Sequence, residues 1–246
     1  MIVEISGIGQ IPGSFIRQKR NAGETHEDLN RMPKSEFKNR LDPPYPRFSR
    51  MDEYGKIGMS AAASALRDAG LDRWEQKRNI GIIVVTCSGC IVTDIDYFHT
   101  VIQKTGGPSS PHLFAYTLPS TFLGDISIHF GLTGPSFVIQ ENPPRGLIGL
   151  CLASDHLMEG GSDAMLVGLC DTSFTDLIDS GVSNRLYTVF IVIKKTLHPS
   201  PKSYGVMEIK GMEDIRIKGK KIKDLSELVH LSLPSSRNQS DSRSIG

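Results

Sequence analysis

The chain has 246 residues, of which 39% are hydrophobic and 22% charged, and its formal net charge is +1. These values are typical of a globular protein with one large domain or two small ones, and they argue against a disordered chain or a nucleic-acid binder. The N-terminus has no basic region before an apolar stretch, and no window approaches roughly 18 uninterrupted apolar residues, so we expect neither secretion nor a membrane span.

The N-terminal third of the chain predicts a strand, a long irregular segment, a helix and a second strand. Residues 2–8 are mainly apolar and predict a short strand. Residues 14–52 are rich in charge and proline, and we interpret them as an irregular surface excursion. Met51–Ala69 has apolar residues at three- and four-residue spacing behind the N-cap residue Asp52, which predicts a helix. Asn79–Thr86 is a β-branched run typical of a strand buried on both faces.

Helices and strands continue to alternate along the rest of the chain. We predict helices at 91–104, 120–130, 145–159 and 225–231, and strands at 137–140, 163–169, 186–195 and 204–210. The last two strands are expected to be neighbours joined by the turn at 199–203. This alternation predicts an α/β fold with a mostly parallel sheet. We divide the chain into a domain at 1–212 and a segment at 213–246 that holds a basic hairpin, a short helix and a disordered polar tail from 235.

Two glycines follow the first predicted strand. Gly7-Ile8-Gly9 could begin a dinucleotide-binding loop, but the third glycine of that motif would fall at Pro12. We therefore interpret Gly7 and Gly9 as turn residues that end the strand, and we predict no cofactor.

The four cysteines are Cys87, Cys90, Cys151 and Cys170. They are too few for a disulfide scaffold, which favours a reducing, cytoplasmic compartment. Cys87 and Cys90 lie between a strand and a helix, where a helix N-terminus lowers a thiol pKa, so a CxxC redox site is one alternative. Cys151 and Cys170 fit small buried positions in apolar segments. Neither the cysteines nor the histidines have metal-ligand spacing, and Asp94 and Asp96 fit a solvated helix start better than a metal site. We therefore predict no metal site.

The densest positive run belongs to the predicted hairpin, and we call it the basic hairpin. It consists of Arg216, Lys218, Lys220, Lys221 and Lys223. The alternation of its basic residues suits one face of a two-stranded ribbon, where charge keeps a solvated sheet edge from pairing with another strand. The alternative is that these residues dock an acidic partner.

The predicted helix at 145–159 is apolar or small nearly all the way round, and such a helix is expected to be buried on every side. It would lie between two sheets, or between its sheet and another subunit. If its far face lacks a cover within the chain, an oligomer is expected, through this helix or through the strand at 137–140.

Several stretches together resemble the N-terminal half of the β-ketoacyl synthases, the thiolase-fold condensing enzymes of fatty-acid and polyketide synthesis. These are IVEISGIG, RMDEYGKIGMSAAASALRDAGLD, SPHLFAYTLPSTFLGDISIHFGLTGPSF and GLIGLCLASDHLMEGGSDAMLVGLCD. The resemblance covers roughly residues 1–212. It implies one βαβαβαββ half of a thiolase-like fold, with a nucleophile at the start of the buried helix.

The chain departs from the family at that nucleophile. Family members read Gly-Pro-Ser, a short strand and then Thr-Ala-Cys-Ser-Ser-Gly; counting from Gly134 to Gly146 places Pro143 where the cysteine belongs, between Asn142 and Pro144. Proline has neither a thiol nor the N–H that would help bind an oxyanion. As helix chemistry, Asn142 is a suitable N-cap and Pro143 a suitable first-turn residue.

Two further family motifs, His-Gly-Thr-Gly-Thr and Asn-Ser-Phe-Gly-Phe-Gly-Gly, belong to the second half and do not occur before Gly246. Relatives called chain-length factors also lack the cysteine and act as partners of an active synthase. The resemblance therefore implies a catalytically silent subunit that forms a homo- or hetero-oligomer with a ketosynthase-type chain or docks an acyl carrier protein. The alternatives are an active 3-oxoacyl-[acyl-carrier-protein] synthase with a relocated nucleophile, Cys87, Cys90 or Cys151, and the CxxC redox protein.

Overall fold

The computed structural model describes residues 1–11, 41–102, 109–171, 188–196 and 198–233. Most of the expected surface excursion and the whole polar tail lie outside these residues. The described end of the excursion, 41–52, contains one short 3-10 helix, η2 (Phe48–Arg50), before the next helix begins.

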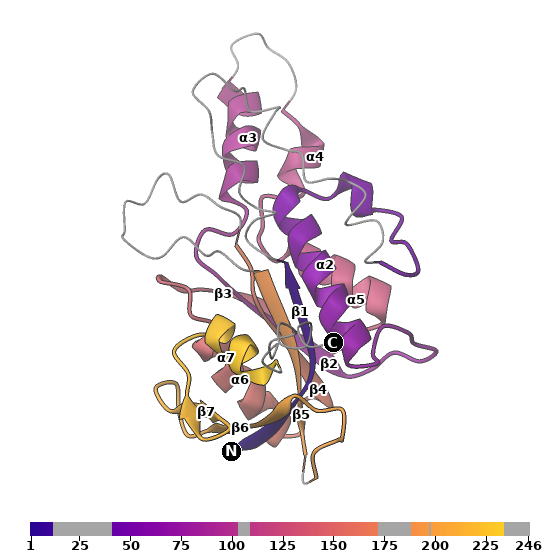
Figure 1. Cartoon of the computed structure of the whole chain (residues 1–246). Coiled ribbons are helices and arrows are strands. Elements are labelled where there is room, and N and C mark those ends of the chain that lie inside the picture. Colours follow the sequence, from indigo (N-terminus) through magenta and orange to yellow (C-terminus); the bar gives the residue numbers. More distant parts are fainter. Residues whose placement is uncertain (12–40, 103–108, 172–187, 197, 234–246) are drawn as a thin grey trace, which may run out of the picture.

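One eight-stranded sheet organises the described residues, with the strand order β3-β2-β4-β5-β1-β6-β7-β8 (Figure 1). The strands are β1 (Ile2–Ile11), β2 (Ile80–Thr86), β3 (Ser136–Gln140), β4 (Ala164–Leu169), β5 (Thr188–Lys195), β6 (Gly205–Ile209), β7 (Ile215–Ile217) and β8 (Lys220–Lys221). The helices are α2 (Glu53–Asp68), α3 (Ile91–Ile102), α4 (Pro111–Phe114), α5 (Thr121–Phe130), α6 (Leu147–Met158) and α7 (Leu225–Ser232).

The α/β class and the βαβαβαββ order from β1 to β5 are confirmed. The expectation of a mostly parallel sheet is wrong: β2 pairs in parallel with β3 and β4, and the other pairings between described strands are antiparallel. The parallel strands are the ones that helices separate along the chain, as a crossover requires. Strands β5 and β6 are not neighbours, because β1 lies between them and pairs antiparallel with both.

Glycines in β1 allow α2 to lie directly on the strand. Gly7 and Gly9 do not end the strand as predicted but sit inside it. A Cβ atom on Gly7 would lie 2.3 Å from the carbonyl oxygen of Ala65, and one on Gly9 would lie 2.1 Å from that of Ala61. These glycines therefore serve a close strand–helix approach, which glycine permits because it has no side chain.

Apolar side chains fill both faces of the sheet. In β2, Ile82 and Val84 face a cluster that includes α2 and α5, while Ile83 and Val85 face a second cluster that includes α6 and α7. The predicted strand buried on both faces is thus confirmed. The residues of β7, β8 and α7, which follow position 212, extend the same sheet and the second cluster.

The predicted ends of two helices are confirmed. Asp52 is the N-cap of α2 and accepts a hydrogen bond from the Gly55 N–H at 2.8 Å, and Gly131 ends α5 with φ of +63°. Of the described helices, none is long and apolar enough to cross a membrane.

Helices α3 and α4 form an arm that extends away from the sheet (Figure 1). Thr93 is the one buried residue of α3. Four large apolar side chains of the arm are between 51% and 61% exposed: Phe98, Val101, Ile102 and Phe114. Leu118, which follows α4, is 65% exposed. An apolar surface of this kind is typical of a contact surface for another molecule.

Candidate functional site: the β3–α6 loop

The β3–α6 loop, residues 141–146, contains the position where the resemblance expects a nucleophile. Helix α6 starts at Leu147, with Gly146 as its N-cap at φ +77°. The prediction that Asn142 caps the helix and Pro143 opens its first turn is wrong, because the left-handed conformation of Gly146 delays the helix by several residues. Asn142 and Pro143 lie exposed in the loop instead.

A carboxylate of the chain occupies the backbone donors at the start of α6. One oxygen of Glu141, Oε2, accepts the N–H groups of Arg145 at 2.8 Å and of Gly146 at 2.9 Å. The other, Oε1, lies 3.7 Å from the guanidinium Nε of Arg145. Pro143 and Pro144 have no N–H to offer. Within the loop, the N–H donors at positions 143 and 144 are thus absent, and those of Arg145 and Gly146 are already paired.

The cysteine closest in sequence to the loop is Cys151, which lies in the second turn of α6. Its side chain is half-buried, and burial, followed by the charge of Asp155, raises the pKa of its thiol. A thiol of this kind is a poor nucleophile at neutral pH because little of it is thiolate. Leu147, Leu150 and Leu157 of the same helix are buried, but Ile148 and Leu152 are only partly so. Within one chain the expected all-round burial of α6 is therefore incomplete.

Cys87 lies beside the loop although it is distant in sequence. The side-chain amide of Gln140 donates to the carbonyl oxygen of Cys87 at 3.0 Å, and the Glu141 N–H donates to the carbonyl oxygen of Thr86 at 2.9 Å. The thiol of Cys87 is half-buried, and burial together with the charge of Asp171 raises its pKa. The backbone of Cys87 therefore neighbours the start of the loop, and the surroundings of its thiol do not activate it.

The second cysteine of the CxxC motif is buried. Burial, and then the charge of Asp94, raises the pKa of the Cys90 thiol to about 12. Its sulfur lies 3.8 Å from a carboxylate oxygen of Asp94. The raised pKa of Cys90 is the opposite of the low thiol pKa on which a redox role would depend. Cys170 is fully buried, and its thiol pKa is raised as well.

Asp171 was not singled out from the sequence, yet its carboxylate organises the turn between β2 and α3. It accepts hydrogen bonds from the N–H groups of Cys87, Ser88 and Gly89 at 2.7–3.2 Å and from the hydroxyls of Thr86 and Ser88 at 2.8 and 2.9 Å. The signal in the sequence is an acid that follows β4, because the carboxyl ends of parallel strands such as β2 and β4 meet at one edge of a sheet.

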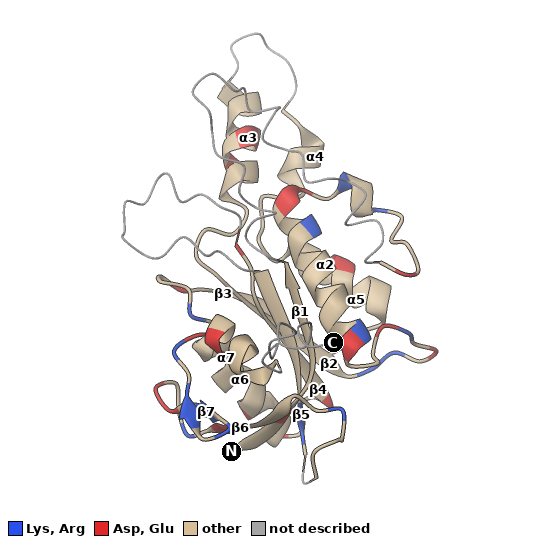
Figure 2. Ribbon diagram, in the orientation of Figure 1, with Lys and Arg blue, Asp and Glu red and all other residues tan. Residues whose placement is uncertain are grey.

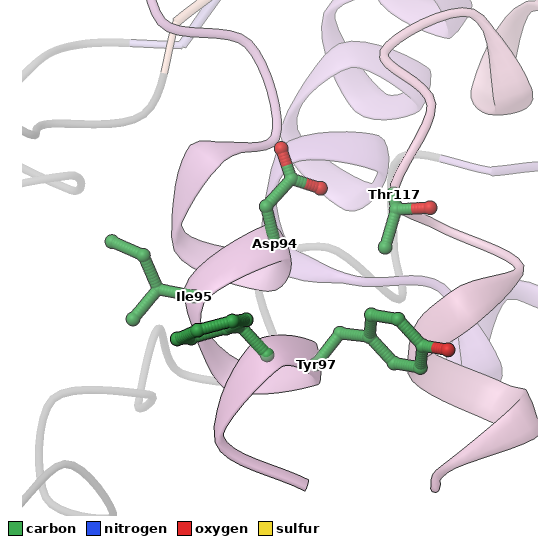
Figure 3. Close-up of a pocket in the computed structure, with 5 residues that line it drawn as sticks. Asp94, Ile95, Tyr97 and Thr117 are labelled. Carbon is green, nitrogen blue, oxygen red and sulfur yellow. The ribbon is translucent and has the colours of Figure 1, made fainter. Parts of the chain in front are cut away.

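A groove of about 430 Å³ lies on the arm (Figure 3). Its lining residues are Asp94, Ile95, Tyr97, Phe98 and Thr117. Asp94 and Tyr97 project from α3 toward the segment that carries Thr117. Neither here nor elsewhere in the described residues do three or more His, Cys, Asp or Glu side chains gather as metal ligands would.

The basic hairpin spans β7, the turn at 218–219, β8 and the two residues that follow (Figure 2). Arg216 is paired with Asp214 at 2.6 Å, and the ammonium of Lys218 donates to the carbonyl oxygen of Leu231 at 2.9 Å. Lys220, Lys221 and Lys223 are exposed and form no ion pair with another described residue. Of the five predicted docking residues, these three remain available to a partner.

The chain is similar to known proteins over most of its length. The family model described as beta-ketoacyl synthase, N-terminal domain, matches residues 3–184. A curated relative, 3-oxoacyl-[acyl-carrier-protein] synthase 2 of Vibrio cholerae, is 26% identical over 185 residues, which make up 70% of this chain and 45% of the relative. The chain spans less than half the length of the curated relatives it matches.

Solved structures share the fold at low sequence identity. The ishigamide ketosynthase/chain length factor has a TM-score of 0.60 at 15% identity, covering 80% of this chain and 63% of that chain. A type II polyketide synthase acyl-carrier protein in complex with its ketosynthase bound to the hexaketide has a TM-score of 0.54 at 18% identity, covering 79% of this chain and 63% of that chain.

Proposed function

The chain belongs to the β-ketoacyl synthase family and has a thiolase-like ketosynthase fold, and from the state of its β3–α6 loop we propose that it is a catalytically silent subunit. In this proposal it works in the cytoplasm in fatty-acid or polyketide synthesis. It pairs with an active ketosynthase-type chain, as a chain length factor does, and contributes to docking of an acyl carrier protein.

The observation that carries the proposal is Pro143 at the position of the family nucleophile. A condensing enzyme needs a thiolate there to accept the acyl chain as a thioester. Proline cannot supply it, and Glu141 holds the N–H groups of Arg145 and Gly146 in the adjoining turn. The nucleophile and the oxyanion donor that its own N–H would supply are therefore lost at one place.

Pairing through β3 is supported by the contrast between the two edges of the sheet. Strand β8 at one edge has two residues, both lysines, and charged short edges resist pairing with another sheet. Strand β3 at the other edge reads Ser-Phe-Val-Ile-Gln and has no charged residue, proline or glycine. It offers its outer backbone groups to a second strand, and the exposed side chains of the arm supply apolar area for the same kind of partner.

Docking of a carrier protein is supported by charge. Acyl carrier proteins are acidic, and the lysines at positions 220, 221 and 223 present three exposed ammonium groups on and just after the edge strand β8. Such a surface raises the rate of encounter with an acidic partner more than the final affinity.

The decisive experiment measures condensation and malonyl-thioester decarboxylation by the purified chain alone and together with an active ketosynthase-type partner. We expect no activity above background from the chain alone and co-elution with the partner. The variant Ser136→Lys should abolish co-elution, because it places a charge at the exposed start of β3, while the matched control Ile128→Lys, at an exposed position of α5, should not. Turnover by the chain alone would overturn the proposal.

One observation favours a second candidate, an active acyl-thioester enzyme that uses Cys87. This thiol lies beside the β3–α6 loop through the contacts of Gln140 and Glu141. Its raised pKa argues against the role. Incubation with an acyl-carrier thioester and mass analysis decides the matter: an acyl adduct on Cys87 that Cys87→Ser abolishes would support this candidate, and an unmodified chain would exclude it.

A further inference from the structure

We infer that the segment 213–233, which we call the C-terminal unit, is a built-in cover locked onto the first turn of α6. The unit contains β7, β8 and α7. Leu225, Leu228 and Val229 of α7 are no more than 4% exposed and share one apolar cluster with α6. A partner segment or acyl chain that approaches this turn from the side of α7 meets the unit first.

The unit is joined to α6 at its N-terminal end by backbone contact. The Leu225 N–H donates to the carbonyl oxygen of Arg145 at 2.9 Å. The Leu225 side chain lies so close to Gly146 that a Cβ atom there would stand 2.5 Å from Cδ1 of the leucine. Glycine is therefore favoured at position 146 for two reasons: the positive φ and the close approach of α7.

Charge adds a second link at the same place. The guanidinium of Arg145 lies 3.7 Å from Glu141 of the β3–α6 loop and 3.5 Å from Glu213 at the start of the unit. Through its N–H, its carbonyl oxygen and its side chain, Arg145 contacts the loop, α7 and the turn before β7. One residue therefore connects the position of the lost nucleophile to the cover.

The far end of α7 is tied down by the hairpin tip. Lys218 and Gly219 both have positive φ, as a two-residue hairpin turn of type I′ requires, and Lys218 is the one described non-glycine residue with this conformation. Its ammonium donates to the carbonyl oxygen of Leu231 in the last turn of α7. A cation at a helix C-terminus is favourable. Asparagine or aspartate, the usual residues at this turn position, would bring no cation to the end of α7, whereas Lys218 does.

This arrangement limits where a partner can bind. The start of α6 is closed by α7, whereas no other described strand covers the outer edge of β3, and the apolar side chains of the arm are exposed. The inference does not depend on whether the chain is catalytically silent, because it concerns only which side of α6 is accessible.

Two glycines that flank α6 allow a matched test. Gly146 has φ of +77° and contacts Leu225; Gly160 has φ of +75° and nothing within 4 Å of an added Cβ. Both Gly146→Ala and Gly160→Ala carry the same backbone strain, but only in the first does the added Cβ overlap the Leu225 side chain of α7. We expect hydrogen exchange of the Leu225 amide and binding of an apolar dye to increase at least tenfold in Gly146→Ala and to stay near wild type in Gly160→Ala.

A second variant keeps the test valid if Gly146→Ala fails to fold. Glu213→Gln removes an exposed ion pair without changing the core, and it should speed exchange of the Leu225 amide a few-fold. Equal behaviour of the two glycine variants, or a Leu225 amide that exchanges at the rate of an unprotected amide in wild type, would overturn the inference.

Discussion

Replacing Glu141 tests whether a single carboxylate holds the β3–α6 loop. The Glu141→Ala variant leaves the N–H groups of Arg145 and Gly146 without their acceptor, and hydrogen bonds to a charged group contribute about 1.5–3 kcal/mol each. Because one oxygen accepts both bonds and the side chain is 15% exposed, some solvent compensation is expected. We therefore predict a loss of about 2–4 kcal/mol in the free energy of unfolding.

The Glu141→Gln variant separates hydrogen bonding from charge. Its amide oxygen can still accept both N–H groups, and the lost ion pair with the 39% exposed Arg145 is worth only about 0–1 kcal/mol. Urea unfolding followed by circular dichroism measures both variants, with unchanged denaturant slopes as the sign that only stability has altered. Glu75→Ala, at an exposed glutamate, is the control and should change little. Equal losses in the alanine and glutamine variants would refute the reasoning.

Three other predictions test the fold, a thiol and the docking surface. Gly9→Ala should lower the free energy of unfolding by about 1–3 kcal/mol, because its Cβ would overlap the Ala61 carbonyl oxygen. Gly124→Ala, on the exposed side of α5, should raise it by about 1 kcal/mol. Thermal unfolding that ranks the two variants otherwise would contradict the packing of α2 on β1. The rate of alkylation of Cys90 should keep rising up to about pH 12, because the thiol pKa in the folded protein is raised from its usual value of 9.0. The stability that this group contributes should be lost as the pH rises between those two values. A plateau of the alkylation rate near neutral pH, measured by mass analysis, would exclude the raised pKa. Reversing the charges of the three unpaired lysines of the basic hairpin should weaken binding of an acidic carrier protein and flatten its salt dependence, which calorimetry at two ionic strengths measures; an unchanged salt dependence would remove these lysines from the interface.

Hydrophobic period and capping chemistry were sufficient to predict most elements. The helix behind Asp52, the strand buried on both faces and the helix that ends at Gly131 are confirmed because local residues specify each of them. Local patterns could not reveal that β1 enters the sheet between β5 and β6, since this depends on pairing between residues about 190 positions apart. They also misassigned Gly7 and Gly9, because a turn glycine and a packing glycine look the same without the helix that covers them.

The candidate site was predictable only in part. Counting from Gly134 led to the prediction that Pro143 stands at the nucleophile position. The role of Glu141, in contrast, depends on the loop folding back onto its own carboxylate, and the position of Cys87 depends on the pairing of β2 with β3. Spacing alone treated Lys218 as one of five equivalent docking residues. The structure distinguishes it, because its ammonium is engaged by the end of α7.

The carboxylate of Asp171 has a consequence for the mechanics of the arm. By accepting hydrogen bonds from three successive N–H groups of the turn that leads into α3, it ties the start of the arm to the end of β4. A small shift of that strand end would be magnified along the length of α3 before it reached Phe98 and Ile102. The orientation of the exposed apolar residues of α3 is therefore coupled to the position of the central strand β4.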